Sequence, residues 1–371
     1  MKITGIETIP VSVPLRPRLM IRASRGTHSA SPFLLVKIHT DEGVVGLGEV
    51  SCTPRWSGED HFTAQHFIKT ILGPILIGQE PSQIEALTAK LDQGVAGNSF
   101  TKAALEMALW DIFGKSVELP VYRLLGGPVR EEITTKWSVS GLEPAPAAEI
   151  ASWAVSEGFQ TIKVKVGIEP GSDLARVKAV RNAVGDEIRV GVDANGGWSL
   201  AAALRTVERL KEYDVFFVEQ PLAPSDIPGM AHIRRRTGLP VIADESLYSP
   251  QDALRLVRAE AADVFSVYVG KAGGIGPARK IVAIAEAAGI ACTIGSNLEM
   301  GVGSAAMIHL AMATAGVRSE HFPCDIIGPL YYEDDLLVEP LPVGKGRARP
   351  LERPGLGVEL DEKKIQRYRV S

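Results

Sequence analysis

The sequence contains little cysteine, few aromatic residues and no long hydrophobic run. Its three cysteines, Cys52, Cys292 and Cys324, are far apart and form no CxxC pair. This spacing argues against a disulfide framework or a zinc site and is typical of reduced thiols in a cytoplasmic protein. No stretch approaches the roughly 18 apolar residues of a membrane span, and the N-terminus lacks the apolar core of a signal peptide. We therefore expect a cytoplasmic protein with no membrane partner.

The chain also lacks a strong excess of charge of either sign. Its formal net charge is −4, and no block of Lys and Arg suggests a nucleic-acid partner. The seven histidines show no spacing of metal ligands. Hydrophobic residues make up 45% of the 371 positions, enough for a sizeable core in one large domain or two ordinary ones. These features together favour a cytosolic enzyme.

Residues 1–125 have the pattern of an α+β unit, with three strands followed by three helices. Strands are expected over 2–13, 33–40 and 44–50, and helices over about 60–72, 81–93 and 99–115. Two polar loops, at about residues 16–31 and 51–60, are rich in Arg, Ser and Gly. Loops of this composition near a domain edge are candidates for a substrate lid.

Residues 126–330 repeat a simple unit, in which a β-branched run ends in a polar residue and a loop and an amphipathic helix follow. The polar ends are Lys165, Asp193, Glu219, Asp244, Lys271, Ser296 and Asp325, separated by 28, 26, 25, 27, 25 and 29 residues. That period matches a strand plus a crossover helix. Eight such units close into an α/β barrel of the (β/α)8 type, whose active site lies at the C-terminal strand ends. The Pro-rich tail, residues 331–371, is expected to return to the N-terminal unit.

One of the predicted strands carries two lysines in an otherwise apolar run. In the stretch TIKVKVG (161–167), Lys163 and Lys165 point to the same side, because side chains on a strand alternate between its faces. Two adjacent ammonium groups are costly there unless negative groups lie opposite them. The neighbouring strand ends supply such groups.

Three carboxylates, Asp193, Glu219 and Asp244, end three consecutive strands and are expected to converge. Carboxylates brought together need a cation, and all-oxygen ligation suits Mg²⁺ or Mn²⁺. Lys271 is expected across the barrel from the lysine pair. The layout fits removal of a proton beside a carboxylate, with the metal ion stabilising the enediolate and a lysine of lowered pKa as the base.

This layout leaves alternatives open. A base on each face of the substrate permits racemisation, whereas a base on one face permits syn elimination or its reverse, cycloisomerisation. An acid at a strand end is also a common helix N-cap, which fits one of Asp244 and Glu245 but not seven polar strand ends in register. A non-catalytic binding barrel would be expected to have lost carboxylates or lysines, and here all are present.

The chain resembles the enolase superfamily, in its muconate-lactonizing subgroup (the mandelate racemase/muconate lactonizing enzyme family), over nearly its full length. The motifs that carry the resemblance are KVK (163–165), DAN (193–195), EQP (219–221), ADES (243–246), KAGG (271–274) and the late DIIGPL. The resemblance implies a modified TIM barrel with an N-terminal α+β capping domain whose two loops choose a small carboxylate substrate. It also implies homo-oligomers.

The resemblance further implies roles for individual residues. Asp193, Glu219 and Asp244 would hold Mg²⁺, Lys165 and Lys271 would be the acid/base pair, and Lys163 would contact the substrate carboxylate. Further residues expected around the metal ion and the substrate are Asn195, Glu245, Ser296, Glu299, Asp325, Tyr268, Trp56 and Arg55.

Residues at the late strand and in the loops narrow the choice of substrate class. Ile327 stands where dipeptide epimerases often carry a second acid after Asp325, whereas the stretch 326–340 looks most like the cycloisomerases. A muconate-type cycloisomerase is therefore the leading hypothesis. The alternative is a racemase or epimerase of an N-substituted amino acid (N-acyl amino acid, dipeptide or betaine type), and a dehydratase such as o-succinylbenzoate synthase comes third.

Two side-chain sets fit different substrates. Candidates to grip the second carboxylate of a dicarboxylate are Arg22, Arg25 and Arg55. Candidates to surround a quaternary ammonium group are Trp56, Tyr268 and Trp137.

Overall fold

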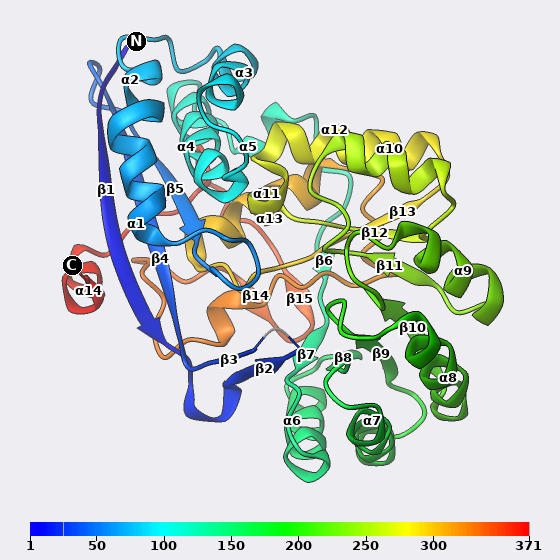
Figure 1. Ribbon diagram of the computed structural model, residues 1–371. Coiled ribbons are helices and arrows are strands. Elements are labelled where there is room, and N and C mark those ends of the chain that lie inside the picture. The colour runs from blue at the N-terminus through cyan, green and yellow to red at the C-terminus, as the bar shows by residue number, and fades with distance from the viewer. Residues whose placement is uncertain (25, 371) are drawn as a thin grey trace.

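The computed structural model describes residues 1–24 and 26–370, except for the side chain of His28. An N-terminal sheet with its helices lies against one side of a barrel, and the tail of the chain runs along both (Figure 1). No helix in these described ranges is long and apolar enough to cross a membrane.

The N-terminal sheet is antiparallel, has the order β1-β4-β5, and is covered on one face by helices. Its strands are β1 (Ile3–Pro14), β4 (Ala30–Thr40) and β5 (Val45–Ser51). The helices are α1 (His61–Phe67), α2 (Gly73–Leu76), α3 (Ile84–Gly94) and α4 (Ser99–Ser116), with a π-helical turn, η2 (Ile68–Leu72), between α1 and α2. The strands and helices predicted for this part of the chain are all present.

The central strand β4 is buried on both faces, which joins the two halves of the molecule. Leu34 packs with the helices of the N-terminal unit, whereas its neighbour Leu35 packs into the core shared with the barrel. On β5, Gly48 lets helix α4 lie directly on the strand, since a Cβ there would meet the Ala104 carbonyl oxygen at 1.8 Å. Alternation along the strand therefore positions the sheet between two layers.

The prediction of a polar loop over residues 16–31 is wrong, because much of this segment is ordered as a β-hairpin. After a short 3-10 turn, η1 (Pro17–Leu19), strands β2 (Ile21–Ala23) and β3 (Gly26–His28) pair antiparallel, with Ile21 opposite His28. The alternating apolar residues Ile21 and Ala23 favour a strand, which the Arg and Ser residues around them conceal. Gly26 has φ +133°, a conformation that L side chains rarely adopt.

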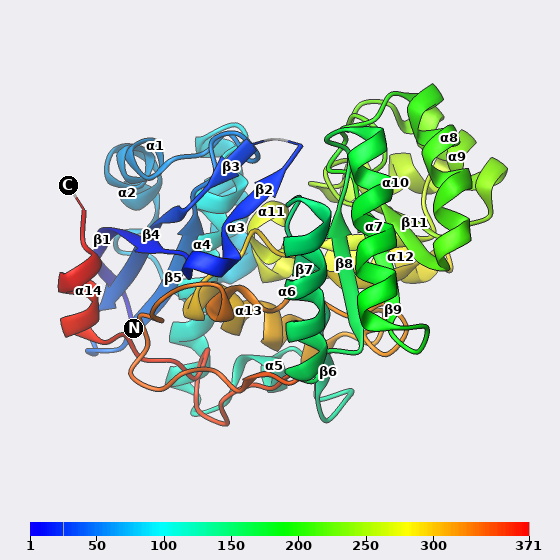
Figure 2. The same ribbon diagram turned by 90° about the horizontal axis from the view of Figure 1, so that it is seen from below.

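Seven parallel strands in the order β13-β12-β11-β10-β9-β8-β7 form the barrel, and helices surround them (Figure 2). The strands are β7 (Trp137–Val139), β8 (Thr161–Lys165), β9 (Arg189–Asp193), β10 (Val215–Glu219), β11 (Val241–Ala243), β12 (Val264–Val267) and β13 (Ala291–Ile294). The helices are α6 (Pro144–Ser156), α7 (Pro170–Val184), α8 (Leu200–Leu210), η3 (Lys211–Tyr213), α9 (Ile227–Thr237), α10 (Pro250–Arg258), α11 (Val269–Ala272), α12 (Ile275–Ala287) and α13 (Gly301–Ala313). The expected modified TIM barrel is confirmed.

An irregular segment closes the ring at the eighth position. Cys324 bridges Thr135 beside β7, and the Asp325 N–H donates to the Ile294 carbonyl at the end of β13, at 2.8 Å. Asp325 thereby reaches the same mouth as the ends of the regular strands.

The tail contacts both halves of the molecule. Strand β15 (Arg347–Ala348) pairs antiparallel with β6 (Ile133–Thr134), and β14 (Val343–Gly344) pairs antiparallel with β15. Helix α14 (Glu362–Tyr368) lies beside β1 (Figure 2), and the Val370 N–H donates to the Pro10 carbonyl at 3.0 Å. The remaining short elements are α5 (Val121–Leu124) and η4 (Gly328–Leu330).

Candidate active site

Charged side chains gather at the C-terminal ends of the barrel strands. Lys165 of β8 is the register partner of Asp193 of β9, and Asp193 is the partner of Glu219 of β10. The side chains of Asp193, Glu219 and Asp244 are all almost completely buried. Parallel strands of similar length end at one edge, so the periodic polar ends lie side by side as the sequence predicts.

Lys163 lies between three of the carboxylates. Its Nζ is 2.8 Å from Asp325 Oδ2, 3.2 Å from Glu219 Oε2 and 3.5 Å from Asp193 Oδ2. Burial opposes the charge of Lys163, but the nearby carboxylates outweigh it and raise its pKa well above the ordinary value. Lys163 therefore remains an ammonium group, as an electrostatic role requires.

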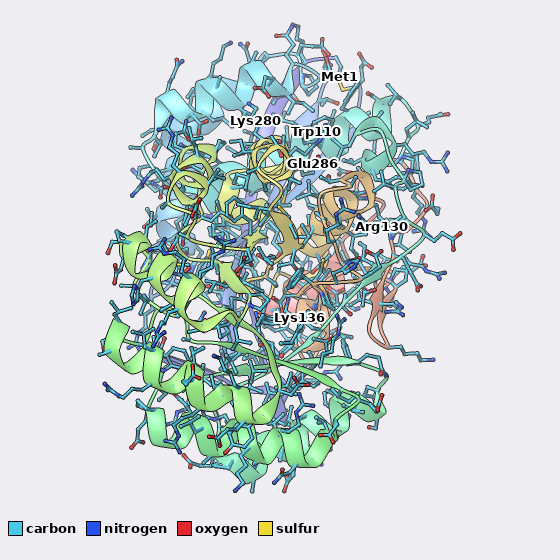
Figure 3. All side chains as sticks on the ribbon, turned by 90° about the vertical axis from the view of Figure 1, so that its right-hand side faces the viewer. Met1, Trp110, Arg130, Lys136, Lys280 and Glu286 are labelled. Atoms are coloured by element: carbon cyan, nitrogen blue, oxygen red, sulfur yellow. The ribbon has the colours of Figure 1, made fainter. Side chains whose placement is uncertain are left out.

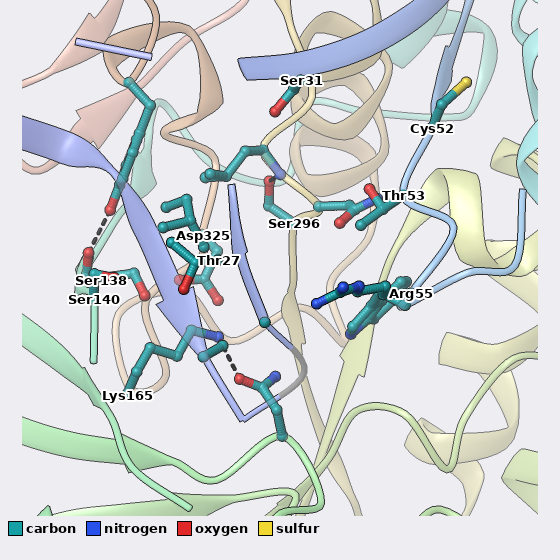
Figure 4. Close-up of a pocket in the computed structure, with 18 of the residues that line it drawn as sticks. Thr27, Ser31, Cys52, Thr53, Arg55, Ser138, Ser140, Lys165, Ser296 and Asp325 are labelled. Carbon is teal, nitrogen blue, oxygen red and sulfur yellow. Dashed lines mark hydrogen bonds between the residues drawn. The ribbon is translucent and has the colours of Figure 1, made fainter. Parts of the chain in front are cut away.

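Lys165 faces the open part of the mouth. Its Nζ donates to Asp193 Oδ2 at 2.6 Å and to Asn195 Oδ1 at 3.0 Å (Figure 4), and 18% of its side chain is exposed. Burial would raise the pKa of Asp193, but Lys165 and Lys163 outweigh it and lower that pKa. Lys165 thus has both an anchoring carboxylate and access to a ligand.

Glu219 has too little positive charge around it. Burial raises its pKa, and although Lys163 opposes this, the charges of Asp193, Asp325 and Asp244 reinforce it, so the pKa reaches about 8. Within the described residues, its side chain accepts hydrogen bonds from Lys163, at 3.2 and 3.3 Å. A cation beside Glu219 would relieve this excess of negative charge.

Lys271 does not end a strand, and this expectation from the sequence period is wrong. Strand β12 ends at Val267, and Lys271 lies on the short helix α11 with 1% of its side chain exposed. Its Nζ donates to Asp244 Oδ1 at 2.6 Å, to the Asp244 carbonyl at 2.7 Å and to the Ser266 carbonyl at 3.0 Å. The strand is followed by a helical turn, which carries Lys271 behind the strand end.

Tyr268 occupies the position directly after β12. Its hydroxyl donates to Asp244 Oδ2 at 2.9 Å, and its ring centroid is 4.1 Å from Lys271 Nζ. Burial, together with the charge of Asp244, raises the pKa of Tyr268 well above the ordinary value, so the phenol stays protonated and donates.

The predicted loop over residues 51–60 reaches from the N-terminal unit over the mouth. Trp56 stacks on Tyr268, with ring centroids 5.4 Å apart, and its Nε1 donates to Glu245 Oε1 at 3.1 Å. Glu59 anchors the loop by accepting the Phe100 and Thr101 N–H groups at the start of α4. Because Trp56 and Tyr268 contact each other, no space for a quaternary ammonium group lies between them.

A cavity of about 470 Å³ lies between this loop, the hairpin β2–β3 and the barrel mouth (Figure 4). Of the described residues, those that line it include Lys163 and Lys165 but not Lys271. The candidate residues that line it are Lys163, Lys165, Asn195, Tyr268, Ser296, Asp325, Trp56 and Arg55. Residues of the hairpin, of the 51–60 loop and of the strand ends therefore share one chamber.

The arginine candidates lie in different places. Arg55 is exposed and lines the cavity, whereas Arg22 lies 3.6 Å from Glu143 and is not among the described lining residues. Arg25 lies outside the described residues. Arg55 is thus the loop arginine placed to meet a ligand.

The buried acids Glu299 and Glu245 hold two of the cavity-lining candidates in place. Ser296 Oγ donates to Glu299 Oε2 at 2.6 Å, and Asn195 Nδ2 donates to Glu245 Oε1 at 3.0 Å. Trp137 is buried and stacks on Tyr331 with centroids 4.7 Å apart, away from Trp56.

Sequence reasoning missed several lining residues and one buried lysine. The missed lining residues are Asn297, Tyr331 and, as Figure 4 shows, Thr27, Ser31, Thr53, Ser138 and Ser140. The missed lysine is Lys136, which is buried in the interior of the molecule (Figure 3). Lys136 Nζ lies 3.0 Å from Asp325 Oδ2. A lysine in the β-branched run ITTKWSVS is a related, weaker signal than the lysine pair of TIKVKVG, because charged residues are seldom buried without a partner.

The residues at the mouth fit a hard divalent cation by their chemistry. In residues 1–24 and 26–370, no three acidic, imidazole or thiol groups converge on one point as they stand. The ammonium groups of Lys163, Lys165 and Lys271 instead bond to the acids. Adjacent carboxylates offer the oxygen ligands that Mg²⁺ prefers, and a divalent cation beside Glu219 would oppose the burial and the acidic neighbours that raise its pKa.

Two family models match most of the chain. Residues 4–126 match the mandelate racemase/muconate lactonizing enzyme N-terminal domain, and residues 146–364 match the enolase C-terminal domain-like family.

Curated relatives span the whole chain. It is 37% identical to the N-succinyl-L-Arg/Lys racemase of Bacillus cereus, over 100% of this chain and 98% of the relative. It is also 37% identical to muconate cycloisomerase 1 of Rhodococcus opacus, over 97% of this chain and 96% of the relative. The names of these two relatives denote different isomerisations, and this chain is 37% identical to each of them.

Solved structures agree with these matches. The 2-chloromuconate cycloisomerase of Rhodococcus opacus superposes with a TM-score of 0.96 at 33% identity, over 100% of both chains. A dipeptide epimerase of Enterococcus faecalis, solved with Mg and the dipeptide L-Leu-L-Tyr, superposes with a TM-score of 0.92 at 32% identity, over 97% of this chain and 100% of the other. With its capped barrel and the acids and lysines at its mouth, the chain belongs to the mandelate racemase/muconate lactonizing enzyme family and is an isomerase of the enolase superfamily.

Proposed function

We propose that this isomerase moves a proton on the carbon beside a substrate carboxylate, with Lys165 as the acid/base. The observation that carries the proposal is the position of Lys165, which lines the cavity and is bonded to Asp193. Its neighbour Lys163 is a permanent cation on the same side and would pair with the substrate carboxylate.

Asp193, Glu219 and Asp244 would hold Mg²⁺, or Mn²⁺, in this proposal. The bound ion supplies positive charge that stabilises the enediolate form of the substrate. Lys163 shields the substrate carboxylate from Asp325 and Glu219, to which it is bonded. Asn195 orients the Lys165 amine through their shared hydrogen bond.

The leading reaction is cycloisomerisation of a muconate-like dicarboxylate. Lys165 lies at one side of the cavity, which suffices for the proton of a ring-closing addition, and Arg55 at the rim is a partner for a second carboxylate. The similarity to muconate cycloisomerase 1 supports this choice.

A racemase or epimerase of an N-substituted amino acid is the second candidate. Asp325 Oδ1 is buried and has no hydrogen-bond partner among the described residues, and it would accept an amide N–H of such a substrate. The similarity to the N-succinyl-L-Arg/Lys racemase supports this alternative. A dehydratase would use the same Lys165 and ranks third.

Two assays separate these reactions. Loss of muconate absorbance with Mg²⁺ would identify the cycloisomerase, and proton NMR of N-acylated amino acids in D₂O would follow exchange at the α-carbon. Lys165→Ala is expected to abolish either activity while the thermal unfolding curve stays close to that of the parent. Retained turnover in this variant, or activity untouched by a chelator, contradicts the proposal.

The division of the chain is part of the proposal. Residues 1–125 would cap the barrel of residues 126–330, and residues 331–371 would tie the two together. The cap contributes Trp56 and Arg55 to the cavity, which supports its role in choosing the substrate. We also propose a cytoplasmic homo-oligomer, which size-exclusion chromatography with light scattering would test.

A further inference from the structure

The wall of the cavity opposite Lys165 is aromatic. Lys165 ends β8, and Tyr268 follows β12, with the strands β9, β10 and β11 between them in the sheet order. In a ring of eight positions this places the two residues on opposite sides of the mouth. Trp56 from the cap stacks on Tyr268 with an interplanar angle of 17° and completes the wall.

Lys271 is sealed behind this wall. An ammonium group has three hydrogens, and the Lys271 ammonium already has three acceptors, the two Asp244 oxygens and the Ser266 carbonyl. The Tyr268 ring lies 4.1 Å from it and the Trp56 ring 6.0 Å from it, and 1% of the side chain is exposed. Its three ammonium hydrogens are therefore engaged, and Lys271 is not among the described residues that line the cavity.

The wall is fixed from several sides. The Tyr268 ring lies against the backbone of Gly295, where a Cβ would be 1.9 Å from its Cε1 atom. Its hydroxyl is held by Asp244, and the Trp56 indole by Glu245. Phe100 at the start of α4 contacts Trp56 edge to face, with centroids 6.0 Å apart. Moving Tyr268 and Trp56 aside together would break these two hydrogen bonds and the contact with Phe100.

We propose that Tyr268 and Trp56 make this active site one-faced, so that Lys165 alone removes and returns the substrate proton. The inference rests on the proposed function. The C–H bond beside the carboxylate breaks, its electron pair stays with the substrate as an enediolate, and the proton passes to the neutral amine of Lys165. It returns to the same face, because on the other face the Lys271 ammonium group is buried and the Tyr268 hydroxyl is engaged by Asp244.

A one-faced site selects the substrate class. Exchange of a proton from one face to the other, which interconverts enantiomers, needs a group on each side of the carbon. Opening and closing a lactone beside a carboxymethyl group needs an acid/base group on one side of the carbon only. Tyr268 is therefore the specificity-determining residue that directs the site toward lactones of unsaturated dicarboxylates.

Lysine labelling tests the wall without any substrate. The full chain loaded with Mg²⁺ is reductively methylated, and peptides are quantified by mass spectrometry. We expect Lys271 to react at least about tenfold more slowly than Lys165, because labelling Lys271 requires local opening. Tyr268→Ala should raise the Lys271 rate by about tenfold, whereas Tyr268→Phe, which keeps the ring, and Tyr368→Ala, the same truncation on α14, should not.

Each outcome of the labelling experiment either supports or overturns the proposal. Equal rates for Lys165 and Lys271 in the parent protein overturn the proposal, and so does a Lys271 rate that Tyr268→Ala leaves unchanged. If Tyr268→Ala fails to fold, the parent protein and Tyr268→Phe still decide, since protection of Lys271 must persist in both.

Deuterium exchange tests the stereochemical consequence. The carbon beside the carboxylate of muconolactone carries two hydrogens, and with enzyme in D₂O we expect one of them to exchange. For an N-acylated amino acid we expect exchange with retention of configuration. Exchange of both hydrogens, or inversion at the rate of exchange, overturns the one-faced site and leaves the role of Lys165 standing. Absence of exchange with every substrate contradicts the proposed function. The labelling experiment then still tests whether Tyr268 and Trp56 cover Lys271, because it needs no substrate.

Discussion

Single residues behind the mouth fix the backbone from which Lys165 projects. Asp173 accepts the Gly167 N–H at 2.8 Å and pairs with Arg176 at 3.0 Å, and Arg176 in turn donates to the Lys165 carbonyl at 3.0 Å. The pair is completely buried at the start of α7. The position of the proposed base therefore depends on an ion pair that never meets the substrate.

We predict that Arg176→Ala lowers the free energy of unfolding by about 3–5 kcal/mol, since it leaves the Asp173 carboxylate buried without its partner. Urea denaturation followed by circular dichroism measures this. Arg255→Ala is the matched control, because Arg255 and Asp252 form the same i,i+3 pair at 3.0 Å with 63% of the arginine exposed. Its expected cost is about 0–1 kcal/mol, and equal losses in the two variants would contradict the argument.

At the scale of elements, α4 lies close against β5 because the strand has glycines where the helix crosses it. We predict that Gly48→Ala destabilises the protein by about 1–3 kcal/mol, because the new methyl group would overlap the Ala104 carbonyl. Gly5→Ala on β1 is the control, since a Cβ there has nothing within 4 Å, and it should change stability by less than about 0.5 kcal/mol. Thermal melts measure the stability of both variants. If Gly48→Ala is as stable as Gly5→Ala, the helix and the strand can move apart to accommodate the methyl group, and the prediction is wrong.

The elements also show how far sequence reasoning reaches. Strands β8 to β11 were predicted together with their polar ends, because buried parallel strands are continuous apolar runs that a charged residue interrupts clearly. The period wrongly places Lys271 at a strand end, because spacing along the sequence does not show that β12 ends four residues before it. The hairpin β2–β3 was missed because its short strands have few apolar residues and are stabilised by contacts with the barrel, such as the Gly141 N–H to the Arg22 carbonyl.

At the scale of the whole molecule, acids of the N-terminal unit bind the ends of barrel helices. Glu106 of α4 accepts the Ile275 and Gly276 N–H groups of α12, each at 2.8 Å. Glu49 of β5 accepts the Met300 and Gly303 N–H groups at α13, at 2.8 and 2.9 Å. Each acid faces the positive end of a helix dipole, so the cap is joined to the barrel by polar groups as well as by the shared core.

Glu49 makes this junction sensitive to pH. Burial raises its pKa to about 8, although the Gly303 and Met300 N–H groups oppose the shift. Between pH 6.5 and 8 the folded protein holds a proton on Glu49 that the unfolded chain, with a glutamate pKa near 4.3, does not hold. Stability is therefore lost as pH rises through this window, by about 1.4 kcal/mol per pH unit from this group. Burial lowers the pKa of His309 to about 4, so His309 is neutral in the folded protein throughout this window. In the unfolded chain, with a histidine pKa of about 6.5, it binds a proton only near the lower end of the window, where it opposes the slope from Glu49.

We predict that Glu49→Gln makes the loss of unfolding free energy between pH 6.5 and 8 less steep by the contribution of Glu49, while Glu219, whose pKa burial also raises to about 8, keeps its own contribution. The amide oxygen still accepts a backbone N–H, but no proton is released as pH rises. Glu106→Gln is the control, since the pKa of Glu106 is raised by burial only to about 7 and the slope between pH 7 and 8 should survive. Urea titrations at half-unit steps of pH measure both variants. A slope that Glu49→Gln leaves intact would mean that the Glu49 carboxyl is already ionised in the folded protein, with the two N–H groups of α13 sufficient to hold its charge.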